Sequence, residues 1–472
     1  MRTAATALLA LLASGCATVS PECASHGGNT WRQVVSPHFS LVTNLGAEEA
    51  KASMLKLEMS RSAVLPVLQG TELSTAPIEV VLFASGAQLN AVAGTDQSFW
   101  SEDFRGPLFV IQDDANILAS NPQLERTLHE LTHLLSARVF RRLPRWVAEG
   151  LASYLETVTL DVKEKTARRG KANQVRLGDI ERWNILPVES LWAWTGVEKD
   201  KPGLEQHRLA SAWFWVYFLV NEHRAAFEGF LKALAKGDGP SAAWKKAFPE
   251  LTTASMASAS DKFRAEGRST GQSIELSRMD LAITESALPD ARVHAVFSRL
   301  AALRGDWKRA AEQADLASSM DANDVAVLEQ VSATRGDPEA RVAAAEKATL
   351  TDPRRVDAWL LLGMASASAK ETALKTVLEL DSSQPTAGAE LAVAAKANGQ
   401  NNESVDFARR AYRAPANARA LAMSADVLAQ AGLCREALTL ELRALESLPH
   451  ALEDTVAAKL HAKLDELAKC AR

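Results

Sequence analysis

Two histidines and a glutamate in residues 128–135 have the spacing of a metal site. His129 and His133 stand four positions apart, and Glu130 directly follows the first of them. Residues four apart on a helix project from the same face, so both imidazoles can reach one zinc ion at about 2.0–2.1 Å. Glu130 lies about 100° around the helix, where its carboxylate can act as a general base without binding the metal. So short a pattern also arises by chance, and on its own it leaves open that both histidines are ordinary helix residues.

A glutamate further along the chain is the predicted third ligand. A second helix, predicted over residues 144–154, carries Glu149 about five residues from its start. His133 lies about five residues before Arg138, where the first helix should end. Each residue would then lie about 7.5 Å along its helix from the turn. If residues 139–143 turn the chain back, Glu149 therefore lies level with His133. Three protein ligands leave one coordination position open for water, which is the arrangement of catalytic rather than structural zinc sites.

The elements that must position these residues follow from hydrophobic periodicity. Asn121 and Pro122 form an N-cap and a first-turn proline for the helix of the two histidines. Strands are predicted over residues 39–43, 78–83 and 107–111, with a helix over residues 47–65. Strands that alternate with helices favour a small mixed α/β lobe. From residue 122 to about residue 280 the pattern is mostly helical, with a break at residues 234–240 and a soft region at residues 252–260.

The last third of the chain repeats a helix-pair pattern. A glycine at the turn, small residues where two helices touch and a proline at the exit recur at intervals of 31 to 33 residues in several units. The best unit has Gly432, Ala437, Ala444 and Pro449, and residues 359–363 read Trp-Leu-Leu-Leu-Gly. Weaker units contain Gly305, Ala310, Ala317, Gly336, Ala348, Pro353, Ser368, Ala373, Pro385, Gly399 and Ala411. Residues 286–450 therefore resemble the tetratricopeptide-repeat family. An alanine-rich helical bundle without repeats is the alternative.

The segments around the predicted ligands resemble those of the glutamate-zincin (gluzincin) peptidases. Residues 129–133 read His-Glu-Leu-Thr-His, and residues 146–152 read Trp-Val-Ala-Glu-Gly-Leu-Ala, similar to the segment that supplies a zinc-binding Glu in aminopeptidase N relatives. The resemblance implies a thermolysin-like, peptidase MA-like α+β domain over residues 31–280. It also implies Zn²⁺ bound by His129, His133 and Glu149, with Glu130 as general base. In that family the strand at residues 107–111 would lie beside the active helix and pair with an extended peptide.

The sequence departs from the aminopeptidases in one segment and leaves the oxyanion donor open. No Gly-x-Met-Glu-Asn segment precedes His129. Such a segment holds a free N-terminus in those enzymes, so endopeptidase action is favoured. Related enzymes place a Tyr or His downstream to stabilise the oxyanion, and the candidates are His207, Arg208 and Tyr217. A surface position for His207 and core packing for Tyr217 remain alternatives.

Other histidines and arginines receive structural interpretations. Six histidines have no partner at metal spacing and are interpreted as structural or solvated: His26, His38, His223, His294, His450 and His461. The basic turn with Arg141, Arg142 and Arg145 could favour acidic substrates, and a solvated turn is the alternative.

The N-terminus predicts export and a lipid anchor. An apolar run from Ala4 to Ala13 is too short to span a bilayer and is typical of a signal peptide. Ser14-Gly15-Cys16 then resembles a bacterial lipobox, which implies cleavage after residue 15 and lipidation of Cys16. Ordinary signal cleavage with an incidental Cys16 is the alternative. Residues 16–30 would form a tether, and the outer membrane is the favoured location because no aspartate follows Cys16.

Three cysteines remain after the proposed anchor. Cys434 and Cys470 both fall in the C-terminal helical domain, residues 286–472, where they could form a disulfide or stay as two buried thiols. No role is assigned to Cys23.

Length and charge set the outer limits of the prediction. The chain has 472 residues, which favours two or three domains, and its formal net charge of -5 gives no reason to expect nucleic acid. The sequence thus predicts a zinc metallopeptidase of the cell envelope whose repeats bind a protein substrate or partner. The alternative is a repeat-based scaffold or chaperone with a vestigial zinc domain.

Overall fold

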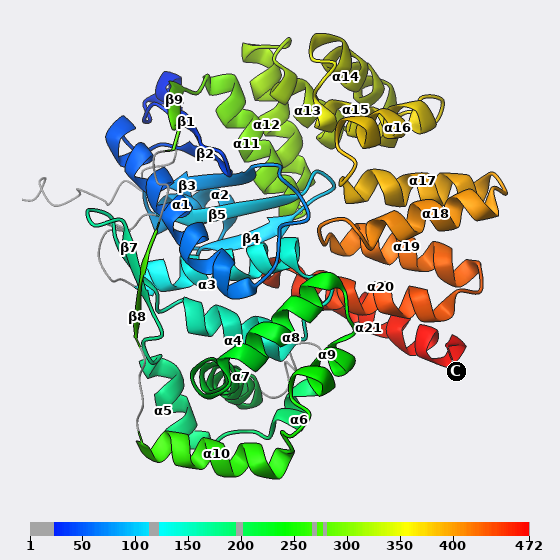
Figure 1. Cartoon of the computed structure of the whole chain (residues 1–472). Coiled ribbons are helices and arrows are strands. Elements are labelled where there is room, and N and C mark those ends of the chain that lie inside the picture. The colour runs from blue at the N-terminus through cyan, green and yellow to red at the C-terminus, as the bar shows by residue number, and fades with distance from the viewer. Residues whose placement is uncertain (1–22, 113–121, 195–201, 267–270, 277–280, 472) are drawn as a thin grey trace, which may run out of the picture.

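The computed structural model divides the chain into a mixed lobe, a helical region and a long array of helix pairs (Figure 1). It describes residues 23–112, 122–194, 202–266, 271–276 and 281–471. The predicted signal peptide, Cys16 and the N-cap Asn121 lie outside the described residues. Within the described residues, no helix combines the length and the apolar character needed to cross a membrane.

A six-stranded sheet is the centre of the mixed lobe. Its strands run in the order β4-β5-β3-β2-β1-β9, and β2, β3 and β5 are parallel to one another. Their bounds are β1 (Arg32–Val35), β2 (Phe39–Thr43), β3 (Ile78–Phe83), β4 (Phe99–Glu102), β5 (Pro107–Gln112) and β9 (Thr284–Ala287). The three predicted strands are therefore confirmed as β2, β3 and β5.

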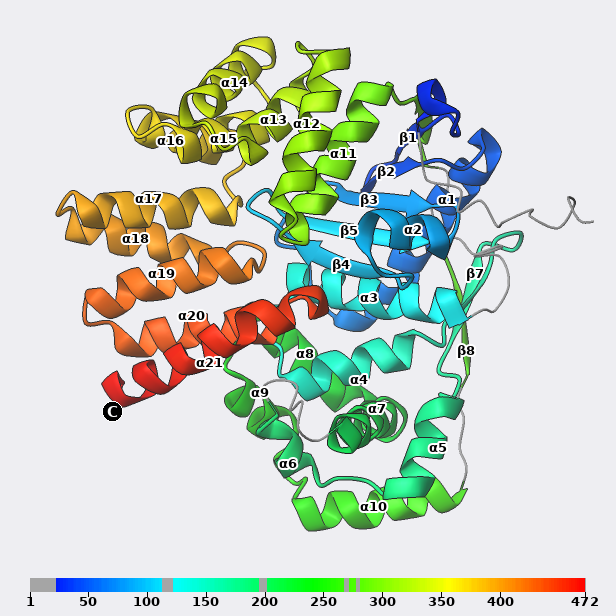
Figure 2. The ribbon, with the colours of Figure 1, turned by 180° about the vertical axis from the view of Figure 1, so that it is seen from behind.

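Alternate residues of these strands face two different helical layers. Leu41, Val80 and Phe109 pack on one face, with helices α1 (Ala47–Leu68) and α3 (Pro122–Val139). Val81 and Val110 pack on the other face, with α2 (Gly86–Ala93) and α11 (Asp290–Leu303). Because α11 is the first helix of the C-terminal array, the array begins inside the core of the mixed lobe (Figure 2).

The expected peptide-pairing strand is not at the sheet edge. β5, predicted over residues 107–111, is hydrogen-bonded to β3 on one side and to β4 on the other. The edge strand is β4, which the sequence pattern missed, and it runs antiparallel to β5. The interpretation of residues 107–111 as a strand open to a peptide is therefore wrong, because both of its ladders are already filled.

Helices dominate the middle of the chain. They are α4 (Arg145–Leu155), α5 (Gln174–Trp183), α6 (Val188–Trp192), α7 (Pro202–Glu222), α8 (Arg224–Lys236), α9 (Pro240–Ala247) and α10 (Thr253–Glu266). A small sheet joins β6 (Thr159–Asp161), β7 (Thr166–Arg169) and β8 (Gln272–Glu275). The predicted break at residues 234–240 separates α8 from α9. The soft region expected at residues 252–260 is instead the first half of α10, because buried Met256 and Phe263 fix it to the core.

Five helix pairs and a final helix follow, as the repeat pattern predicts. The pairs are α11 with α12 (Trp307–Met320), α13 (Val325–Thr334) with α14 (Pro338–Thr351), α15 (Val356–Ala365) with α16 (Lys370–Leu380), α17 (Pro385–Ala397) with α18 (Asn401–Ala411), and α19 (Ala418–Gln430) with α20 (Cys434–Glu446). Gly305, Gly399 and Gly432 each adopt a φ of 76° at the turns, a conformation that favours glycine. The predicted contact alanines, such as Ala310 and Ala437, are fully buried.

The array ends on a short 3-10 turn, η2 (His450–Leu452), and helix α21 (Glu453–Cys470). A disulfide joins Cys434 to Cys470 and so ties the end of α21 to the start of α20. Cys23 lies buried with its sulfur 3.2 Å from His294 Nε2.

Candidate metal centre

Helices α3 and α4 pack against each other and present the three predicted ligands to one point. Pro144 is the N-cap of α4, and every residue of α4 from Trp146 to Leu155 is buried. Gly150 permits this packing: a Cβ atom at this position would lie 2.5 Å from the Ala212 carbonyl oxygen of α7. The residue after Glu149 must therefore be very small for α4 to sit at this depth.

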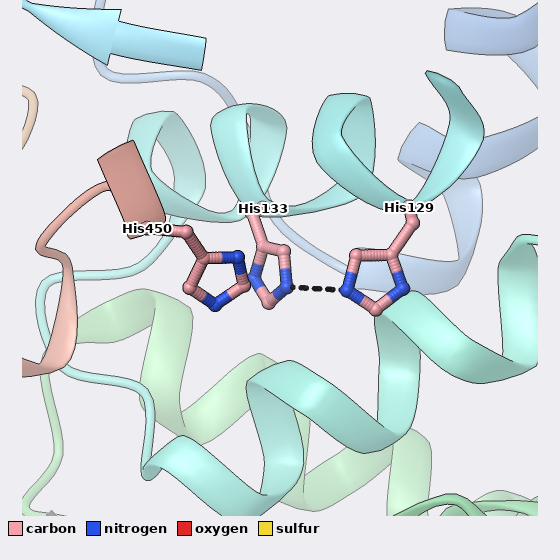
Figure 3. A group of neighbouring side chains, drawn as sticks. All are labelled: His129, His133 and His450. Atoms are coloured by element: carbon pink, nitrogen blue, oxygen red, sulfur yellow. Dashed lines mark hydrogen bonds between the residues drawn. The ribbon is translucent and has the colours of Figure 1, made fainter. Parts of the chain in front are cut away.

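The ligand atoms form a compact triangle. His129 Nε2 lies 3.1 Å from His133 Nε2 (Figure 3), and Glu149 Oε2 lies 3.7 Å from the first nitrogen and 3.5 Å from the second. Bonds of about 2.0–2.1 Å in a tetrahedron would separate ligand atoms by roughly 3.3–3.4 Å. The three measured separations bracket this value, so the side chains fit a zinc-sized ion without large movement.

One corner of this triangle, Glu149 Oε2, is a buried oxygen atom without a hydrogen-bond partner in the part of the chain that the structure describes. Glu149 is 3% exposed, and its Oε2 has no hydrogen-bond partner among the described residues. Burial alone would raise the pKa of Glu149, but the nearby imidazoles of His133, His450 and His129 lower it well below its usual value. An ionised, orphaned carboxylate oxygen facing two imidazole nitrogens is suited to a cation.

A second carboxylate orients the first histidine. Glu156 Oε2 lies 2.6 Å from His129 Nδ1, and Asn173 donates from its side-chain amide to the other oxygen of Glu156. Burial alone would lower the pKa of His129, but Glu149 and Glu156 raise it to about 9. Because Nδ1 faces Glu156, Nε2 is the nitrogen at the metal position, and it would release its own proton on binding a metal. The sequence analysis missed Glu156, although it lies one turn beyond Ala152 at the C-cap of the predicted helix.

Glu130 lies beside the triangle as a buried anion. Its side chain is 0% exposed, and Arg126 Nη2 lies 2.6 Å from its Oε1. Burial alone would raise the pKa of Glu130, but His450, Arg126 and His129 lower it to about 2. The carboxylate is therefore ionised at neutral pH and able to accept a proton.

An unforeseen histidine from the far end of the chain completes the cluster. His450, on η2, has its Nε2 3.1 Å from Glu149 Oε1 and its Nδ1 3.6 Å from Glu130 Oε1. The nitrogens of His129, His133 and His450 all lie within 4.8 Å of one another (Figure 3). Burial alone would lower the pKa of His450, but the two carboxylates raise it to about 10. The interpretation of His450 as structural or solvated is therefore wrong: it is 301 residues from Glu149 in sequence, so no local spacing could reveal the contact.

The predicted oxyanion donors lie elsewhere. His207 is half-buried and has its Nε2 3.1 Å from the Asn184 carbonyl oxygen, while Tyr217 is buried and stacks on Trp213 at 5.2 Å. Neither lines the cleft beside the triangle in the described part of the chain. Tyr217 therefore has the core position that was the alternative to an oxyanion donor, and His207 contacts the Asn184 carbonyl oxygen.

The basic turn between the two helices is tied to acidic partners. Arg142 pairs with Glu446 of α20 at 2.6 Å, and Arg145 lies 3.6 Å from Glu205 and 3.8 Å from Glu149. The turn is therefore neither simply solvated nor a free basic patch.

A cleft of about 330 Å³ opens beside the triangle. Its lining residues are Glu125, Arg126, His129, Arg145, Glu149, Glu156, Arg176, Glu205, Leu209 and His450. The cleft therefore gives access to two of the three predicted ligands, His129 and Glu149, and to the side chains of Glu156 and His450.

Comparison with known families gives one partial match. A family described as "Protein of unknown function (DUF1570)" matches residues 127–238, a segment that contains His129, Glu130, His133 and Glu149. No curated protein matches this chain.

Several solved structures show a partial similarity to this chain. TTC0263, a thermophilic TPR protein of Thermus thermophilus, is 12% identical, with 38% of this chain and 98% of that chain covered and a TM-score of 0.33. MamA is 20% identical over 33% of this chain and 91% of its own, with a TM-score of 0.26. YrrB, described as a TPR protein with an unusual peptide-binding site, is 17% identical over 36% of this chain and 90% of its own, with a TM-score of 0.25.

Proposed function

We propose that this protein is a zinc-dependent endopeptidase. The observation that carries the proposal is the triangle of His129 Nε2, His133 Nε2 and Glu149 Oε2, whose sides of 3.1, 3.7 and 3.5 Å suit one tetrahedral cation. A set of three ligands with nitrogen and oxygen donors favours a catalytic site over a structural one. On this proposal the mixed lobe and the helices up to α10 are a thermolysin-like gluzincin domain.

Zinc held there would supply Lewis-acid activation of water and of the substrate carbonyl. Glu130 accepts a proton from the attacking water and returns it to the leaving nitrogen, because its carboxylate is ionised and lies beside the ligands. Arg126, 2.6 Å from Glu130 Oε1, holds that carboxylate in place. Glu156 holds the His129 ring so that its Nε2 faces the metal position.

The proposal is tested with Glu130→Gln and a peptide library. The variant keeps the shape of the side chain but loses the proton acceptor, so it should retain zinc and lose cleavage by about 10²–10⁴-fold. Glu164→Gln, which changes an exposed carboxylate in the turn between β6 and β7, is the matched control and should cleave like the wild type. Zinc content is measured in all three proteins. Wild-type protein that holds zinc but cleaves no peptide would favour the scaffold or chaperone alternative.

The array of helix pairs is proposed to hold a protein substrate or partner. Trp307 is 58% exposed and Leu350 is 82% exposed, on α12 and α14. Single exposed apolar side chains are common on protein surfaces, so the support for this role is the stack of helix pairs, which forms an extended binding surface. Leu350→Asp should raise KM for an unfolded protein and leave the cleavage of short peptides unchanged. An unchanged KM for both substrates would contradict this role.

The cell envelope is the proposed location, with Cys16 as the lipidated residue. The support is the sequence pattern that ends at Cys16. Cys16→Ser should move the protein from the membrane fraction to the soluble exported fraction. Membrane association that survives this substitution would contradict a lipid anchor at Cys16.

A further inference from the structure

The C-terminal array is hydrogen-bonded to the mixed lobe at the turn between β4 and β5. Gln384 Nε2, at the N-cap of α17, donates to the carbonyl oxygens of Phe104 and Arg105 at 3.2 and 3.3 Å. Asn417 Nδ2, at the N-cap of α19, donates to the Asp103 carbonyl oxygen at 3.0 Å. The N-termini of α17 and α19, the first helices of two successive pairs, thus hold the backbone of one turn, which fixes the array relative to the edge of the sheet.

A second set of contacts joins the array to the end of the histidine helix. Arg142 donates to both carboxylate oxygens of Glu446 at 2.6 and 3.0 Å. The Ala416 backbone N–H donates to the Ala137 carbonyl oxygen at 3.2 Å. Within the array, buried Arg443 donates to the carbonyl oxygens of Ala411, which ends α18, and of residues 412 and 414 in the loop that follows. The segment that follows α20 is therefore anchored immediately before His450.

These anchors place His450 between the general base and a metal ligand. η2 lies against the edge strand β4, and His450 contacts Glu149 through Nε2 and Glu130 through Nδ1. It touches Glu149 at Oε1, at 3.1 Å, whereas His129 and His133 face Oε2. His450 thus lies outside the ligand triangle. Its ring also lines the 330 Å³ cleft from one side.

We propose that His450 is a catalytic residue supplied by the helical repeats. Its Nε2 is held by Glu149 Oε1, whereas its Nδ1 is 3.6 Å from Glu130 Oε1, beyond hydrogen-bonding distance. The Nδ1–H donates to the oxygen of the attacked carbonyl as negative charge develops there. The active site is incomplete without the C-terminal array, because the array holds the His450 imidazole in place. This inference rests on the proposed hydrolase function, because the donor acts on that reaction.

The test compares His450→Ala and His450→Gln with the wild type in the full-length chain. His461→Ala, on the neighbouring helix α21, is the matched control. Zinc content, circular dichroism, kcat/KM on the best library peptide and the affinity of the zinc-loaded protein for acetohydroxamate are measured. Acetohydroxamate presents an oxyanion to zinc whatever the peptide preference. The wild type and His461→Ala should agree within twofold in every measurement.

His450→Ala should keep its zinc and its fold, lose about 10²–10³-fold in kcat/KM, and bind acetohydroxamate about tenfold or more weakly. His450→Gln keeps an N–H donor and should recover part of both losses. Loss of zinc from His450→Ala would show that His450 is a ligand, and a rise in activity would show that it obstructs the site. Either result overturns the proposal. A kcat/KM and an acetohydroxamate affinity that both stay within threefold of the wild type also overturn it. If the wild type cleaves no peptide, the proposed function fails, and the acetohydroxamate comparison still decides the role of His450.

Discussion

Replacing Glu156 by glutamine should weaken zinc binding although Glu156 is not a proposed ligand. Its two carboxylate oxygens each receive a donor: His129 Nδ1 at 2.6 Å and the side-chain amide of Asn173. A glutamine amide has one acceptor oxygen and one NH₂ group. The variant must therefore turn a donor toward another donor, at either His129 or Asn173.

The size of the effect follows from these contacts. His129 is 5% exposed, so a lost partner cannot be replaced freely by water. Loss of a hydrogen-bonded charge behind a ligating imidazole typically costs about 10–100-fold in metal affinity, or about 1.4–2.7 kcal/mol. We expect the zinc dissociation constant of Glu156→Gln to rise by that factor.

Competition with a chromophoric chelator measures the dissociation constant directly. Glu164→Gln, an exposed carboxylate of the same region, should match the wild type, and Glu156→Ala should bind zinc no more tightly than Glu156→Gln. Glu156→Gln protein whose dissociation constant stays within twofold of the wild type would refute the idea that this carboxylate orients His129.

Three further predictions concern stability. Burial raises the pKa of Glu102 to about 8, so between about pH 5 and 8 the folded protein keeps a proton that the unfolded chain has released. The free energy of unfolding should fall as pH rises, by at most roughly 1.4 kcal/mol per pH unit, and chemical denaturation of Glu102→Gln should show a flatter profile; equal slopes would contradict this. Gly150→Ala places a methyl group against the Ala212 carbonyl oxygen and should lower the free energy of unfolding by about 1–3 kcal/mol, measured by thermal melting, whereas an unchanged melting temperature would show that α4 and α7 can separate freely. Cys470→Ser removes the bond to Cys434 and should speed amide exchange in α21, with unaltered exchange as the contrary result.

Much of the fold could be predicted from local pattern. Alternating or continuous apolar runs gave β2, β3 and β5, because buried strands at the centre of a sheet carry strong hydrophobic signals. The helix pairs followed from turn glycines and buried alanines. The edge strand β4, residues 99–102, was missed because it has four residues and follows a loop. Residues 252–260 were misjudged because small polar residues there form a helix that tertiary contacts of Phe263 stabilise.

Some residues of the candidate site could also be predicted from local spacing, and others could not. His129, Glu130 and His133 lie on one helix, and Glu149 lies on the next helix along the chain, after a short turn. Their sequence spacing was therefore enough to predict that they meet. Glu156 follows Glu149 by seven residues, about two helical turns, so its place on the same face of α4 could have been predicted from spacing. His450 depends on how separate elements pack, and no periodicity in the sequence encodes that packing. The predicted oxyanion donors lie on α7, whereas the residue that the structure brings to the site from the C-terminal array is His450.

A crystal structure of the zinc-loaded protein, with anomalous data collected at the zinc edge, tests the central claim most directly. The account predicts one strong anomalous peak about 2.0–2.1 Å from His129 Nε2, His133 Nε2 and Glu149 Oε2, with a solvent molecule in the remaining position. A peak elsewhere, or a zinc ion that leaves Glu149 out of its coordination sphere, would contradict it.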